Sequence, residues 1–158
     1  REEAEIRTLD GAILVGDRYP LLHIHPPGDM GAVVASGSFL HDGMIIVPAS
    51  SNTMGCIAAG ITGNLVHRAA LVSLKEGRPL VIAHRESPTG RIDLQNMLRL
   101  DEAGAIIAPL NAGFYLHPET IDDLVDFMAG RLLDLLGIPH GLDLRWNPEP
   151  GQRLNAPG

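Results

Sequence analysis

Three short apolar runs, separated by stretches with helical periodicity, constrain the fold of this chain most strongly. The runs are GMIIVPA (43–49), RPLVIAH (78–84) and GAIIAPL (104–110). They are rich in Val and Ile and do not alternate with polar residues, which is typical of strands buried on both faces of a parallel sheet. The alternation of strands and helices predicts an α/β fold. We expect a doubly wound, Rossmann-like or flavodoxin-like parallel sheet with helices on both faces.

Four helices are predicted between and after these runs. Their expected ranges are 51–61, 64–77, 90–104 and 118–137. The first follows Ser and Asn residues that are good helix caps, and the others have apolar residues at three- and four-residue spacing. Gly77, Gly104 and Gly137 would end the last three, and Pro118 would start the final one.

The amino-terminal part of the chain does not fit this alternation. A doubly wound fold normally opens with a strand, a Gly-rich turn and a helix. The sequence instead begins with Arg, and REEAEIRTL (1–9) has a helical composition with no strand before it. We therefore expect the amino-terminal unit, one or two strands with their loop, to be missing. We predict one α/β domain, residues 1–138, and an extended Pro/Gly-rich arm, residues 139–158.

Charge and composition exclude several classes of function. The net charge is −7, and the 12 Lys and Arg residues form no cluster, which argues against a nucleic acid or an anionic membrane surface as partner. No apolar run approaches the length of a membrane span, and no signal peptide is visible. The single Cys56 excludes an internal disulfide framework and a Cys-based zinc site, so we predict a cytoplasmic protein.

The seven histidines do not form a metal-binding pattern. HIHPP (23–27) offers two imidazoles, and its spacing places no third ligand beside them. Zinc sites in proteins use at least three protein ligands. The sequence therefore predicts no metal site.

Polar or aromatic residues follow each of the three predicted strands. In open α/β sheets, ligands bind beyond the carboxyl ends of the strands. The first strand leads into small polar residues, the second into a cation and a carboxylate, and the third into two aromatic residues: Ser50, Ser51, Asn52, Thr53; Arg85, Glu86; Phe114, Tyr115. Hydroxyls and backbone N–H groups at a helix start can bind a phosphate. Simple capping would need only one of the four small residues, Tyr115 could pack a loop, and Arg85 with Glu86 could form a surface ion pair.

Three longer stretches carry a family resemblance. They are SGSFLHDGMIIVPASSNT (36–53), NLVHRAALVSLKEGRPLVIAHRESP (64–88) and GAIIAPLNAGFYLHPETIDDLVDFMAGRLLDLLGIPH (104–140). Together they resemble the flavin prenyltransferases, the UbiX-type flavoproteins, from about Asp29 to Trp146.

This resemblance implies a metal-independent prenyltransferase for which FMN is both substrate and cofactor. Such an enzyme moves a dimethylallyl group from dimethylallyl monophosphate to nitrogen 5 of the flavin and closes a fourth ring at carbon 6. The prenylated FMN then serves a partner decarboxylase. The resemblance also implies a homo-oligomer, a dodecamer, with flavin sites shared between subunits.

The resemblance further assigns roles to residues at matching positions. Six residues would hold the flavin: Ser50, Ser51, Asn52, Thr53, Arg85 and Trp146. Glu86 would assist proton transfer near the prenyl phosphate. That phosphate would be bound by Lys75, Tyr115 and Arg131, and Arg68 would join from a neighbouring subunit.

These roles agree with the chemistry of a leaving phosphate, which gains charge as its carbon–oxygen bond breaks. Cations and hydroxyl donors at that oxygen stabilise the transition state more than the ground state. Two of the cations also have simpler explanations. Lys75 would lie in the last turn of its helix, where the helix dipole favours a cation. Arg131 precedes Asp134 by three residues and could form a surface ion pair with it.

The sequence departs from the family pattern at three places. Asn52 stands where many members have Lys, so a positive charge is lost, and Ser87 replaces the usual Thr after Arg-Glu. The family's Gly-x-Ser-Gly-Ala loop, which binds the flavin phosphate, is not found. Two alternatives therefore stay open: a flavin-dependent decarboxylase, and a non-catalytic flavin-binding or assembly subunit of a decarboxylase.

Overall fold

The computed structural model describes residues 22–142 of the chain. In chain order these residues form η2 (Val33–Ala35), β1 (Met44–Ala49), α2 (Ser51–Ala58), α3 (Leu65–Lys75), β2 (Leu80–His84), α4 (Arg91–Glu102), β3 (Ile106–Ile107), η3 (Phe114–Leu116) and α5 (Ile121–Leu135). The two η elements are short 3₁₀ turns. The predicted order of strands and helices is confirmed over this range.

The three strands form one parallel sheet in the order β1-β2-β3. Met44 of β1 pairs with Leu80 of β2. The register shifts before Ala49, which pairs with His84. The carboxyl ends of β1 and β2 therefore lie side by side.

The third strand is shorter than the predicted run 104–110. Gly104 has a φ of 97° and belongs to the turn that ends α4, and Pro109 has no N–H to donate to a strand ladder. The N–H of Leu110 still donates to the carbonyl oxygen of His84 at 3.0 Å. The segment after β3 is therefore tied to the end of β2.

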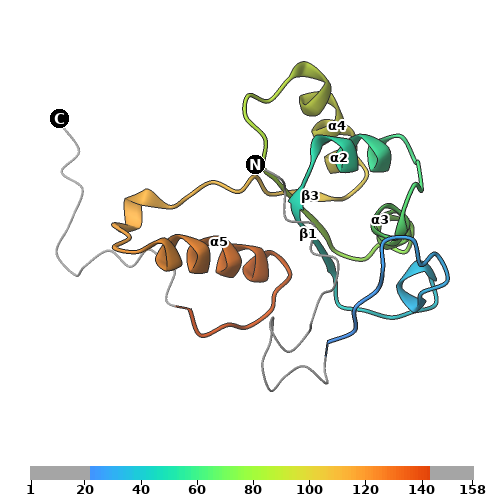
Figure 1. Cartoon of the computed structure of the whole chain (residues 1–158), viewed down its shortest axis with the longest axis horizontal. Helices are drawn as coiled ribbons and strands as arrows, with labels where there is room; N and C mark the ends of the chain where they lie inside the picture. Colours follow the sequence, from blue (N-terminus) through green and yellow to red (C-terminus); the bar gives the residue numbers. More distant parts are fainter. Residues whose placement is uncertain (1–21, 143–158) are drawn as a thin grey trace, which may run out of the picture.

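Both faces of the central strand β2 are buried, which explains why its sequence does not alternate. Leu80 and Ile82 pack against residues of α2, α3 and α4, whereas Val81 and Ala83 pack against Leu132 of α5. These four side chains are 0% exposed, and His84, the fifth residue of β2, is 3% exposed. Figure 1 shows α2, α3 and α4 gathered on one side of the strands and α5 on the other. The prediction of helices on both faces is confirmed.

Side-chain caps set the starts of three helices. Ser50, Asn64 and Thr120 each accept a hydrogen bond from the backbone N–H three residues later, at the starts of α2, α3 and α5. Such a bond satisfies one of the N–H groups that a helix start leaves unpaired. α5 therefore begins at Ile121, and the prediction that Pro118 starts this helix is wrong.

No helix among residues 22–142 combines the length and apolar character that crossing a membrane requires. Over the same residues, no three His, Cys, Asp or Glu side chains are grouped so that they could hold a metal ion.

Candidate functional site

The end of β2, the start of α4 and the segment after β3 border one cavity, which we call the strand-end cavity. Its volume is about 450 Å³, within the range of small-molecule sites, roughly 300–1,000 Å³. Leu94 and Met97 of α4 form an apolar wall. The charged and polar lining comes from β2 and the two loops: His84, Arg85, Glu86, Ser87, Thr89 and Asn111. The cavity lies at the carboxyl ends of the strands, where α/β proteins bind their ligands.

The four small polar residues after β1 have different environments. Ser50 Oγ accepts the N–H of Thr53 at 3.2 Å, and its hydroxyl also donates to the Thr53 hydroxyl at 3.2 Å. Ser51 is half-buried, with Oγ 3.4 Å from Nε2 of His84. Asn52 is exposed. Capping therefore explains Ser50, but it leaves the Asn52 amide accessible to a ligand.

Arg85 and Glu86 carry the charges of the strand-end cavity. Both side chains are exposed and line it. Among residues 22–142, neither side chain takes part in an ion pair. The backbone N–H of Arg85 points to the carbonyl of Ala49 at 3.4 Å, so the turn stays beside β1. The surface ion pair that could have explained this strand end is not formed.

A polar cluster that the sequence analysis missed lies beside the cavity. It joins Ser51, His84 and Asp93. The pKa of the Asp93 carboxyl is lowered by hydrogen bonds from Ser51 and from the Gly90 N–H, the latter at 3.0 Å, and by the nearby His84. His84 is 3% exposed. Its partner Ser51 is 33 residues away in the chain. The only sequence signal was that His84 follows its apolar run without a spacer.

Tyr115 lies in η3, which follows β3 in the chain, and Arg131 lies on α5. Arg131 lines a second cavity of about 290 Å³, which shares Asn111 with the strand-end cavity. Its Nη1 donates to Asp134 Oδ2 at 3.4 Å, so the ion pair suggested by the spacing is present. Tyr115 is 62% exposed, and its ring meets that of Phe127 edge-on with centroids 5.9 Å apart. Arg131 itself does not line the strand-end cavity.

Lys75 and Arg68 lie elsewhere. Lys75 ends α3, which leads into the amino end of β2. Glu86 follows the carboxyl end of β2, so the two residues lie at opposite ends of the strands. Its Nζ pairs with Glu76 Oε1 at 3.1 Å. Arg68 Nε donates to the carbonyl of Ala35 at 3.1 Å. Within one copy of the chain, the structure does not bring these two cations to the strand-end cavity.

Two sequence predictions fall on parts of the chain that the structure does not describe. Trp146, expected to cover the flavin, lies outside residues 22–142, and so does most of the predicted arm, 139–158.

Comparisons with known proteins show which family this chain resembles. A family model described as Flavoprotein matches residues 24–133. The flavin prenyltransferase UbiX of Halalkalibacterium halodurans is 45% identical over 153 residues, which cover 94% of this chain and 74% of that protein.

Two solved structures are similar in both fold and sequence. AnUbiX in complex with FMN and dimethylallyl pyrophosphate has a TM-score of 0.79 and 44% identity, covering 84% of this chain and 70% of that one. The dodecameric FMN-dependent UbiX-like decarboxylase of Escherichia coli O157:H7 has a TM-score of 0.75 and 47% identity, covering 78% and 66%. These similarities confirm the flavodoxin-like fold.

Proposed function

Because the chain belongs to the UbiX-type flavin prenyltransferases of the flavoprotein family, we propose that it prenylates FMN. The proposed reaction transfers a dimethylallyl group from dimethylallyl monophosphate to the flavin, and the prenylated FMN serves a partner decarboxylase. One observation carries the proposal: the strand-end cavity has Arg85 and Glu86 on its wall, next to the polar first turn of α2.

The residues around the cavity fit a flavin nucleotide. The Asn52 amide and the backbone N–H groups of the first turn of α2 are donors for anionic or carbonyl oxygens. The Arg85 guanidinium adds charge-assisted hydrogen bonds. The apolar wall of Leu94 and Met97 suits a planar ring. When bound, FMN supplies the ring nitrogen that accepts the prenyl group.

We assign proton transfer to Glu86. Its exposed carboxylate lines the cavity beside Arg85. A carboxylate near a phosphate ester is repelled unless one of the two is protonated, so Glu86 is a poor residue for binding alone. A positioned carboxylate is, however, well suited to accept and return a proton during ring closure.

We assign binding of the prenyl phosphate to residues from two copies of the chain. Arg131 and Tyr115 serve from the same copy, since the cavity that Arg131 lines shares Pro109, Leu110 and Asn111 with the strand-end cavity. Lys75 and Arg68 serve from a neighbouring copy, because in its own copy Lys75 lies near the amino ends of the strands, away from the cavity. The dodecameric state of the Escherichia coli relative supports such sharing. Together these donors would stabilise the charge that develops on the leaving phosphate.

The identity of the prenyl donor needs a direct test, because the structure of AnUbiX is a complex with dimethylallyl pyrophosphate, not the monophosphate. Full-length protein would be incubated with FMN and either the monophosphate or the pyrophosphate, and the flavin would then be analysed by mass spectrometry. We expect a product heavier by one dimethylallyl unit with the monophosphate. Protein that binds FMN and modifies it with neither donor would be a flavin-binding subunit. Protein that binds no FMN at micromolar concentration would contradict the flavin site itself.

A further inference from the structure

His84 is the most deeply buried polar side chain in the lining of the strand-end cavity. It ends β2 and is 3% exposed, whereas Arg85 and Glu86, which follow it, are exposed. Buried polar side chains almost always have a hydrogen-bond partner. The partner of His84 is Ser51, whose Oγ lies 3.4 Å from Nε2 of the imidazole.

This contact joins two elements next to the cavity, β2 and α2, and the start of α4 lies near them. His84 ends β2, and Ser51 is the first residue of α2. Asp93 lies in the first turn of α4, and the Ser51 hydroxyl is the main cause of the lowered pKa of its carboxyl. The first turn of α4 is closed in the same place, because the Gly90 N–H donates to Asp93 at 3.0 Å. The Ser51 hydroxyl is therefore held against the buried imidazole that ends β2.

We propose that His84 is a positioning residue of the flavin site. By holding the Ser51 hydroxyl, it fixes the first turn of α2, whose N–H groups and Asn52 amide are the donors assigned to the flavin. The inference rests on the proposed flavin site, and it adds a residue to which the family resemblance gave no role.

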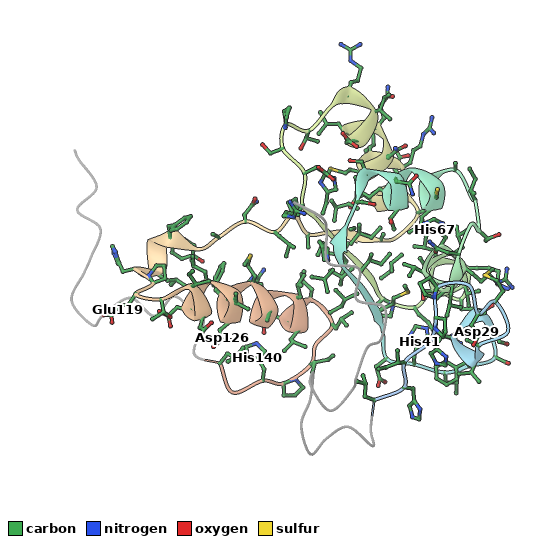
Figure 2. All side chains as sticks on the ribbon, in the orientation of Figure 1. Asp29, His41, His67, Glu119, Asp126 and His140 are labelled. Atoms are coloured by element: carbon green, nitrogen blue, oxygen red, sulfur yellow. The ribbon has the colours of Figure 1, made fainter. Side chains whose placement is uncertain are left out.

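His67 provides a matched control. It is also 3% exposed, but within residues 22–142 neither of its ring nitrogens has a hydrogen-bond partner. It lies on α3, on the side of the molecule away from α5 (Figure 2), and does not line the strand-end cavity. Replacing either histidine by Leu removes a buried imidazole, but only His84→Leu breaks the contact with Ser51.

The test measures the dissociation constant for FMN, by quenching of flavin fluorescence, alongside the melting temperature. Full-length wild type would be compared with His84→Leu, His84→Gln and His67→Leu. We expect FMN to bind about 10-fold more weakly to His84→Leu, as for the loss of one hydrogen bond. His84→Gln keeps a donor for Ser51 and should recover most of the affinity, and His67→Leu should bind as the wild type does.

A double-mutant cycle with Ser51→Ala separates positioning from general stability. If His84 acts through Ser51, His84→Leu should add no further loss to that of Ser51→Ala. Additive losses, or a folded His84→Leu protein with unchanged FMN affinity and a lower melting temperature, would overturn the role of His84. If His84→Leu does not fold, His84→Asn, which is too short to keep the contact, takes its place. Wild type that binds no FMN would overturn the flavin site, and this inference with it.

Discussion

Two neighbouring side chains after β2, Arg85 and Glu86, have separable roles in the proposed site. Glu86→Gln keeps the shape of the side chain but removes the group that carries the proton. We expect the variant to fold, retain FMN and lose about 10²–10⁴-fold in turnover. Single-turnover prenylation, followed by mass spectrometry of the flavin, measures this loss directly.

Arg85→Ala is the matched variant for Glu86→Gln. It removes a donor that would contact the flavin, so FMN should be retained more weakly while bound FMN is still prenylated. A Glu86→Gln protein with normal single-turnover prenylation and a lower melting temperature would show that this carboxylate only stabilises the fold.

At the level of elements, Gly113 controls how the segment before η3 lies against α5. A Cβ at this buried position would lie 2.6 Å from Cε1 of Phe127, and the Phe127 ring also contacts Tyr115. Gly113→Ala should therefore lower the free energy of unfolding by about 1–3 kcal/mol. It should also raise the KM for the phosphate donor, because Tyr115 moves with the ring.

Thermal unfolding and steady-state kinetics check the effect of Gly113→Ala. Gly141→Ala is the control, because no atom lies within 4 Å of a Cβ placed at Gly141. An unchanged melting temperature in Gly113→Ala would mean that the segment yields without cost, and Gly113 would then have no packing role.

The start of α5 should make stability depend on pH. Asp123 Oδ2 accepts the N–H groups of Thr120 at 2.8 Å and Glu119 at 2.9 Å, and these bonds, with the Thr120 hydroxyl, lower the pKa of Asp123 below its usual 3.8. Because the pKa is lower in the folded state, the stabilisation is complete above 3.8 and is lost as the pH falls through the folded-state value.

The measurement is thermal unfolding of wild type and Asp123→Asn between pH 7 and pH 3. We expect Asp123→Asn to melt at a lower temperature at pH 7, and the difference to shrink as the pH falls below about 4. Asp122→Asn, at the next position, is the control and should change the melting temperature less. A difference that stays constant down to the lowest pH would show that the carboxylate charge does not stabilise this helix start.

Sequence predicts elements better than it predicts contacts between them. The apolar runs and capping residues are local signals, and they located all three strands and four helices of the described range. Boundaries failed where a competing local feature acted, as with Thr120, which takes the cap position that moves the helix start away from Pro118. The contact between His84 and Ser51 could not be predicted, because the two residues come from different strand ends and lie 33 residues apart in the chain.

At the level of the whole molecule, a single copy exposes many large apolar side chains. They include three residues of α4 and two of α5: Ile92 74%, Leu94 56%, Leu98 58%, Ile121 78% and Val125 50%. α4 and α5 cover opposite faces of the sheet, and exposed apolar side chains on both suggest contact sites on two sides of the molecule. We expect light scattering at micromolar concentration to give the mass of a homo-oligomer, and Ile92→Asp to reduce that mass. A sharp monomer mass for the wild type would contradict a shared active site.

A shared site makes a prediction that no single copy could fulfil. Glu86 lines the strand-end cavity of its own copy, whereas Lys75 lies at the opposite end of the strands. In the proposed site, Lys75 therefore serves a neighbour's phosphate. Lys75→Ala and Glu86→Gln should each be nearly inactive alone. In oligomers assembled from equal amounts of both variants, about a quarter of the sites combine an intact Glu86 with a neighbour's intact Lys75. Prenylation should therefore recover to about a quarter of wild-type turnover after the two proteins are unfolded and refolded together. Oligomers that contain both variants, as shown by differently tagged copies, but remain inactive would rule out a role for Lys75 at a neighbour's phosphate.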